Sequence, residues 1–153
     1  MPRCSVLIVV GSKSDLDTME EARKTLEGFG VSSELVVASA HRQPAKVREL
    51  AARVQEGGAD VVIAGAGMAA HLAGTLASLT TVPVIGVPLL ADSFGALDSL
   101  LSTVQMPAGV PVAVVSAGKA GAVNAAVLAV EILSLKDGSL KPRLSEYRKK
   151  FSS

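Results

Sequence analysis

The sequence predicts an α/β fold, a three-layer αβα sandwich built on a central parallel sheet of the flavodoxin or Rossmann kind. Short apolar runs rich in β-branched residues alternate with longer segments of helical periodicity, as in sheets whose parallel strands are joined by crossover helices. The first run, Ser5–Val10, has the unbroken apolar character of a strand buried on both faces. With 153 residues and no internal repeat, linker or low-complexity segment, the chain is expected to form a single domain over residues 1–153.

The first half of the chain contains clear start signals for its elements. The first helix is expected to begin at Ser14, whose hydroxyl would cap it, with Asp17 three positions later completing a capping-box-like pair. Leu35–Ala38 is predicted as the second strand. Pro44 suits the first turn of the second helix, and Val61–Ala64 is predicted as the third strand.

The second half continues the alternation and ends in helices. Its predicted elements are a helix at Ala69–Leu79, a strand at Val84–Val87, a short helix at Leu97–Val104, a strand at Val112–Ser116, a long helix at Ala120–Leu133 and a polar helix over about 140–150. The long helix is apolar nearly all round, which indicates burial on every side. Because the outer layer of a sandwich normally faces water, a partner subunit is expected to cover it, and the chain is expected to form a homo-oligomer.

The overall composition excludes several classes of function. A formal net charge of +1 with mixed signs argues against nucleic acid as the main partner. A single cysteine, Cys4, excludes an internal disulfide and a thiolate metal cluster. Residues 61–91 have no charged side chain, but glycines and a proline interrupt them, so no membrane span is expected. The amino terminus lacks a signal-peptide pattern, and a cytoplasmic location is expected.

Both histidines follow predicted strands, in the segments 39–42 and 69–72, and a third polar segment, 11–15, follows the first strand. Loops at the carboxyl ends of parallel strands lie side by side, and ligands bind there. Histidine titrates near neutral pH, and the arginine beside His41 is a natural phosphate ligand. The sequence therefore predicts an acid–base site for a small polar, phosphorylated molecule.

Two other patterns in these loops are weaker. Gly65-Ala66-Gly67-Met68-Ala69-Ala70 matches a dinucleotide-binding fingerprint, but the acidic residue expected about 20 positions later is missing. Its glycines indicate close approach either by a ligand or by a packed helix, and the sequence leaves both open. Two histidines suggest a metal, yet no third ligand has suitable spacing, so no metal is expected.

Several segments together resemble a known family, the N5-carboxyaminoimidazole ribonucleotide mutases of purine biosynthesis. These segments are GSKSD at 11–15, SAHR at 39–42 with Pro44, GAGMAAHL at 65–72, DSLLSTVQMPAGVPV at 98–112 and GKAGAVNAA at 118–126. The likeness covers nearly the whole chain in order. It implies conversion of N5-carboxyaminoimidazole ribonucleotide to 4-carboxy-5-aminoimidazole ribonucleotide by decarboxylation and recarboxylation, in a cytoplasmic homo-octamer that needs no metal and no organic cofactor.

The resemblance also implies roles for individual residues. His41 would be the catalytic residue that transfers protons. The substrate nucleotide would bind Ser12, Asp15 and Arg42, with Ser14 and Ser39 nearby. The pocket in which the carboxylate moves would be lined by Gly67, Ala70, His71 and Leu72.

Three positions depart from the family pattern, and other functions stay open. Gln43, Met68 and Ala73 stand where the family usually has Thr, Gly and Pro. A sister branch carboxylates aminoimidazole ribonucleotide with free CO2, but it typically has His-Lys at 41–42 and lacks the second histidine. A flavin- or nucleotide-binding module of flavodoxin type, or a relative acting on another ring, are the remaining alternatives.

Overall fold

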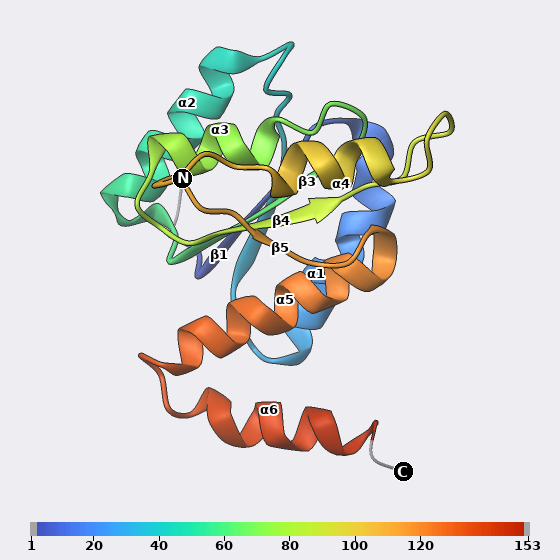
Figure 1. Ribbon diagram of the computed structural model, residues 1–153. Helices are drawn as coiled ribbons and strands as arrows, with labels where there is room; N and C mark the ends of the chain where they lie inside the picture. The colour runs from blue at the N-terminus through green and yellow to red at the C-terminus, as the bar shows by residue number, and fades with distance from the viewer. Residues whose placement is uncertain (1–2, 152–153) are drawn as a thin grey trace.

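The computed structural model describes residues 3–151 and contains one parallel sheet of five strands (Figure 1). The strands are β1 (Val6–Val10), β2 (Ser33–Val37), β3 (Val61–Ala66), β4 (Val84–Pro88) and β5 (Ala113–Val114). Their order is β2-β1-β3-β4-β5, the flavodoxin-like order, in which the chain switches direction across the sheet between β1 and β3. The predicted three-layer α/β fold is confirmed.

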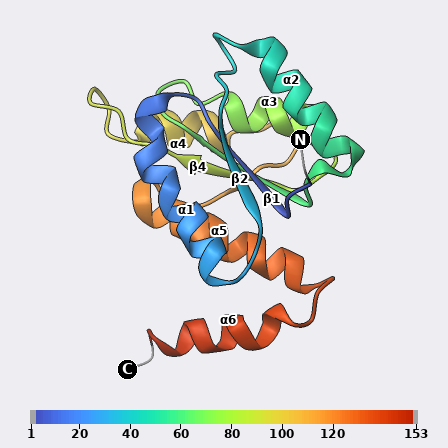
Figure 2. The same cartoon turned by 180° about the vertical axis from the view of Figure 1, so that it is seen from behind.

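Helices cover both faces of this sheet (Figures 1 and 2). The helices are η1 (Lys13–Asp15), α1 (Leu16–Gly28), α2 (Pro44–Arg53), η2 (Val54–Gly58), α3 (Leu72–Leu79), α4 (Leu97–Val104), α5 (Gly118–Ser134) and α6 (Leu140–Lys149). One face is covered by α1 and α5, and the other by α2, α3 and α4, while α6 lies on the outer side of α5. The last helix is predicted at about 140–150, and this prediction is confirmed.

Alternation along the strands divides the interior into two cores. Val6, Ile8 and Val10 face the α1 and α5 side, whereas Leu7 and Val9 face the α2 and α3 side, and all five are fully buried. A strand buried on both faces needs apolar side chains at every position, because neither face meets water. The uninterrupted apolar run near the start of the chain therefore predicts this strand correctly.

The long apolar helix α5 is covered within the chain. Ala125 and Ala129 are fully buried, and they share one core with Leu140 and Leu144 of α6. Part of the layer expected from a partner subunit is thus supplied by α6, so burial of this helix does not by itself require an oligomer, and the oligomer stays a prediction. Within residues 3–151, no helix combines the length and the apolar character that crossing a bilayer requires.

The start of the first helix differs from the prediction. Ser12, not Ser14, acts as the cap: its hydroxyl accepts a hydrogen bond from the Ser14 backbone N–H at 3.4 Å and begins the short turn η1. The helix α1 follows at Leu16 without a side-chain cap. The carboxylate of Asp17 forms an ion pair with Lys119 at 3.0 Å, so the predicted capping-box pair is wrong.

Two further boundaries differ. The helix predicted from Ala69 begins at Leu72, and residues 67–71 form an irregular loop. Strand β5 has two residues, although five were expected. It lies at the edge of the described sheet and pairs with β4 alone. Hydrogen bonds to a single neighbouring strand therefore set its length.

Candidate functional site

A cavity of about 910 Å³ opens at the carboxyl ends of the strands. The loops that follow β1, β2, β3 and β4 all contribute to it. Its lining includes Gly11, Ser12, Ser14, Asp15, Ser39, His41, Arg42, Gly67, Met68, His71, Leu72, Leu90, Asp92, Phe94 and Asp98. The β1 and β3 loops meet here because these strands are neighbours at the switch point, where open parallel sheets bind ligands.

The two histidines contact each other at this cavity. Nε2 of His41 lies 2.7 Å from Nδ1 of His71, and the two rings meet edge to face with centroids 4.8 Å apart. Such a hydrogen bond needs one N–H and one bare ring nitrogen, so the pair shares a proton between two facing imidazoles. Both side chains are exposed to solvent in the single chain. The arrangement supplies a proton donor and a proton acceptor at one point of the cavity.

Arg42 is held over the end of β1. Its Nη2 donates to the carbonyl oxygen of Gly11 at 3.2 Å, and its Nε donates to the hydroxyl of Ser39 at 3.4 Å. The same hydroxyl accepts from the Arg42 backbone N–H at 3.2 Å. Gln43 completes this turn, because its N–H donates to the Ser39 carbonyl at 2.8 Å. These contacts leave the guanidinium exposed beside the β1 loop, where it can bind an anion.

Hydroxyls and a carboxylate gather at η1. The Ser14 hydroxyl donates to that of Ser12 at 2.9 Å and lies 3.5 Å from Oδ1 of Asp15. Burial raises the pKa of Asp15, and hydrogen bonds from the Ser12–Ser14 turn and the charge of Arg42 partly oppose that rise. A half-buried carboxylate of this kind gains from a ligand that donates hydrogen bonds, as two neighbouring hydroxyls of a sugar do.

The glycines of the β3 loop have different roles. A Cβ added to Gly65 would lie 2.8 Å from the sulfur of Met19, so this glycine permits close packing of α1 on the sheet. A Cβ on Gly67 would approach the Leu89 carbonyl most closely, at 3.4 Å, and this residue lines the cavity. Helix packing therefore explains Gly65, whereas close approach of a ligand at Gly67 stays a prediction.

Helix α4 supports this loop from the side. The Ser102 hydroxyl accepts from the Ala70 N–H at 2.9 Å and lies 3.4 Å from the carbonyl oxygen of Met68. Ser99, which is fully buried, donates to the Leu89 carbonyl at 2.8 Å. Two turns of one helix thus fix the backbones of both the β3 and the β4 loops.

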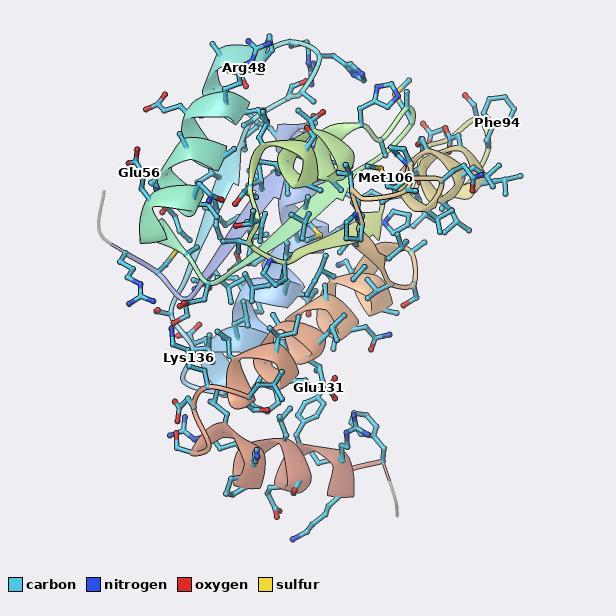
Figure 3. All side chains as sticks on the ribbon, turned by 60° about the vertical axis from the view of Figure 1, so that its left-hand side comes forward. Arg48, Glu56, Phe94, Met106, Glu131 and Lys136 are labelled. Carbon is cyan, nitrogen blue, oxygen red and sulfur yellow. The ribbon has the colours of Figure 1, made fainter. Side chains whose placement is uncertain are left out.

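The structure brings the predicted site residues to one cavity, with one exception. Ala70 does not line it; its side chain is buried and its N–H is bound to Ser102. The β4 loop, with Leu90 and Phe94, was missed as a contributor, as was Asp98 in the first turn of α4. The loop's position after a predicted strand was the available signal, because that places it at the same edge of the sheet. Phe94 lies at the outer end of this loop (Figure 3).

The cavity is lined by an arginine, two histidines, hydroxyls, carboxylates and apolar side chains. Within the part of the chain that the structure describes, no three His, Cys, Asp or Glu side chains gather as metal ligands would. The side chains that line the cavity can form hydrogen bonds, bind anions and transfer protons. Fold and site together define a flavodoxin-like α/β protein with a cavity at its switch point that holds two facing histidines and an arginine.

Comparison with known proteins identifies the family. Residues 5–153 match the family model of AIR carboxylase. The N5-carboxyaminoimidazole ribonucleotide mutase of Pyrococcus abyssi is 55% identical over 97% of this chain and 83% of its own length. That of Escherichia coli (strain K12) is 49% identical over 94% and 85%. The chain therefore belongs to the AIR carboxylase family, and the resemblance to the mutases is confirmed.

The fold agrees with this assignment. The crystal structure of Treponema denticola PurE superposes with a TM-score of 0.87 at 27% identity, covering 98% of this chain and 92% of that chain. A variant of PurE2 from the same organism gives 0.88 at 26% identity, with the same coverage of both chains. Since the more similar curated relatives are named mutases, carboxylation with free CO2 is the less favoured activity.

Proposed function

We propose that this protein is an isomerase of purine biosynthesis that converts N5-carboxyaminoimidazole ribonucleotide to 4-carboxy-5-aminoimidazole ribonucleotide. The proposal is supported by curated mutases about half identical to the chain. The observation that carries it is the pair His41 and His71, joined at 2.7 Å in a cavity that also holds Arg42. A carboxylate shift between two atoms of one substrate needs one proton delivered and one removed, which an imidazole can do near neutral pH.

The nucleotide tail would bind at the β1 and β2 loops. Arg42 and the hydroxyls of Ser12 and Ser14 offer donors for a phosphate, with the hydroxyl of Ser39 holding the guanidinium in place. Asp15 would accept hydrogen bonds from the ribose hydroxyls. Binding energy from this charged tail would hold the heterocycle against the histidines and so contribute orientation to the chemical step.

The chemical step would take place beside the histidine pair. The bond between the exocyclic nitrogen and the carboxylate carbon breaks and releases CO2, and His41 gives its proton to that nitrogen. Ring carbon 4 then forms a bond to the same CO2, and its proton passes to His41, which is restored. Atoms and charge balance without any further reactant. His71 would hold the His41 ring in the tautomer and orientation that this exchange requires.

Released CO2 must stay in place between the two half-reactions, and water must stay out. Gly67 and Leu72 would form the small apolar pocket for it. His41 is exposed in the single chain, so the site needs additional cover from substrate, from loops or from another subunit.

A homo-octamer in the cytoplasm is part of the proposal. Large apolar side chains lie exposed on and around α4, next to the cavity, and we call these six residues the α4 patch: Leu90, Phe94, Leu97, Leu100, Leu101 and Val104. Contiguous exposed apolar surface is typical of an interface between proteins. A second copy seated there would bury this surface and also close the mouth of the site.

The decisive experiment offers the carbamate nucleotide to the purified protein and follows formation of the carbon-linked product by absorbance. Turnover in buffer depleted of bicarbonate is the expected result. Product formation only from aminoimidazole ribonucleotide, and only with added bicarbonate, would instead identify a carboxylase. A purified protein that binds flavin mononucleotide and ignores both imidazole nucleotides would contradict the proposal altogether.

A further inference from the structure

The loop of residues 67–71 carries His71 to the cavity, and regular structure fixes both of its ends. At one end, the Ala66 carbonyl of β3 accepts a backbone hydrogen bond at 2.9 Å from the residue that follows β4. At the other, the His71 carbonyl accepts from the Thr75 N–H of α3, also at 2.9 Å. Between these ends the backbone is irregular, and Met68 has a φ of +56°. A left-handed conformation at a residue other than glycine persists where neighbouring groups hold it.

The hydroxyl of Ser102, on α4, holds the middle of this loop. The Ala70 N–H donates to it at 2.9 Å, and the Met68 carbonyl oxygen lies 3.4 Å from it. A hydroxyl has a single hydrogen, and its closest acceptor is the Asp98 carbonyl, one turn earlier in α4, at 2.7 Å. The hydroxyl is therefore oriented by its own helix, and it presents its lone pairs to the loop.

The contact with Ser102 is made directly before the histidine. Ala70 precedes His71 in the chain, and its side chain is buried, with 2% of its surface exposed. The backbone that leads into His71 is thus anchored, and the ring extends to the point where its Nδ1 lies 2.7 Å from Nε2 of His41. A displacement of this backbone by about 1 Å would take the two nitrogens beyond hydrogen-bond distance.

We propose that Ser102 is a positioning residue: by binding the Ala70 N–H, its hydroxyl keeps His71 at hydrogen-bond distance from His41. The inference deepens the proposed mutase function, and its kinetic test rests on that function. Ser102 itself does not line the cavity, so it acts through the loop and not on the substrate. Its loss misplaces one histidine and leaves in place the β1 and β2 loops, which are proposed to bind the nucleotide tail.

Three variants of the full chain test this role. Ser102→Ala removes the acceptor and puts a stronger helix former in α4. Ser102→Thr keeps the hydroxyl, at a half-buried position, although threonine is the weaker helix former. Ser78→Ala is the matched control, because this exposed serine also donates to a carbonyl of its own helix, that of Thr75 at 2.8 Å, and does not line the cavity.

Steady-state kinetics with the carbamate nucleotide measure the effect on the reaction. In Ser102→Ala we expect kcat to fall about 10- to 100-fold, as misplacement of a reacting group by about 1 Å does, with KM changed less than about threefold. Ser102→Thr should stay within about threefold of the wild-type kcat, and Ser78→Ala should match wild type. An unchanged kcat in Ser102→Ala, or an equal loss of kcat in the Ala and Thr variants, would overturn the proposal.

Nitrogen-15 spectra of the imidazole rings test the geometry without any turnover. The chain has two histidines, so in an untagged protein the ring signals come from His41 and His71 alone. His41 belongs to a different loop from the one that Ser102 holds, so a change in its signals reports on its bond to His71. We expect the signals of both rings to move in Ser102→Ala and to stay near wild type in Ser102→Thr and Ser78→Ala.

The two measurements separate this inference from the proposed function. Unchanged His41 signals in Ser102→Ala would overturn the positioning role, whatever the kinetics show. If wild type turned over no carbamate nucleotide, the proposed function would fail, and the spectra would still decide whether Ser102 holds the histidine pair together.

Discussion

At the scale of single residues, His41 faces His71 across 2.7 Å in a cavity that Arg42 also lines. In the proposed function the histidines transfer protons and Arg42 binds the phosphate. Substitutions of the histidines and of Arg42 should therefore affect different kinetic constants.

Replacing His41 with Asn removes the titratable imidazole and keeps a polar group at the δ position. We expect turnover of the carbamate nucleotide to fall by about 10²- to 10⁴-fold. Affinity for the product, measured by calorimetry, should change by less than about threefold, since Arg42 is untouched. A parallel loss of binding and turnover would contradict the assigned role.

Replacing Arg42 with Ala removes the guanidinium beside the β1 loop. Charge-assisted hydrogen bonds contribute about 1.5–3 kcal/mol, so KM should rise about ten- to hundredfold with kcat reduced far less. Lys46→Ala is the matched control. Its ammonium donates to the Val37 carbonyl at 2.8 Å and does not line the cavity. An unchanged KM in Arg42→Ala would remove Arg42 from phosphate binding.

The ionisation of Asp15 should make the free energy of unfolding depend on pH. Its pKa is raised, chiefly by burial, so the folded protein holds this proton more tightly than the unfolded chain. The free energy of unfolding therefore falls as the pH rises from the ordinary carboxyl pKa of about 3.9 through the raised pKa of Asp15. Above that raised pKa, the loss of stability no longer changes with pH. Asp15→Asn lacks this ionisation.

We expect Asp15→Asn to gain stability over wild type across that interval and to keep the gain at neutral pH, while nucleotide affinity falls. Urea unfolding of both proteins between about pH 4 and pH 8 measures the difference. A difference that does not vary with pH would show that burial of the Asp15 charge carries no cost.

At the scale of elements, the site depends on how closely α4 packs on the sheet. A Cβ on Gly86, in the middle of β4, would lie 2.5 Å from Cγ2 of Thr103 and 2.9 Å from Cγ1 of Val112. Both neighbours are β-branched and buried or half-buried, so they cannot turn away easily. The spacing between β4 and α4 is set by this contact, and α4 holds the β3 and β4 loops.

Gly86→Ala should therefore lower the free energy of unfolding by about 1–3 kcal/mol through overpacking. Gly28→Ala is the control, because nothing lies within 4 Å of its added Cβ at the end of α1. That variant should be neutral or stabilised by up to about 1 kcal/mol. Urea denaturation measures both, and equal stability of the two variants would refute the packing argument.

At the scale of the whole molecule, apolar surface remains exposed where the site opens. Leu101 of α4 is 55% exposed within the α4 patch, whereas Leu135, which is 84% exposed, lies at the turn between α5 and α6. Lys136, its neighbour, is on a different side of the molecule from Phe94 (Figure 3). If the α4 patch is the subunit interface, assembly needs Leu101 and does not need Leu135.

Leu101→Glu should reduce the assembly to smaller species and lower turnover, since a buried unpaired charge is strongly unfavourable at an interface. Leu135→Glu should leave the assembly and turnover unchanged. Light scattering after size-exclusion chromatography gives the masses. Dissociation by Leu135→Glu alone would move the proposed interface away from α4.

Local patterns in the sequence determined the layers of this protein and the edge at which its site lies. The run ending at Val10 specified a fully buried strand, because hydrophobic periodicity depends only on neighbours along the chain. The sequence also placed His41, Arg42 and Asp15 at the cavity. These polar residues come just after predicted parallel strands, whose carboxyl ends lie at the same edge of the sheet. The segment likenesses that assigned the family were also properties of the sequence alone.

Only the tertiary structure decided which of these groups touch. The bond between His41 and His71 joins residues 30 positions apart, and it depends on the strand order that places the β2, β1 and β3 loops side by side. The left-handed backbone of Met68 is likewise held by a distant segment, since its carbonyl lies 3.4 Å from the Ser102 hydroxyl of α4. Long-range contacts of this kind leave no periodic signal in the chain, because their energy depends on partners that folding alone brings together.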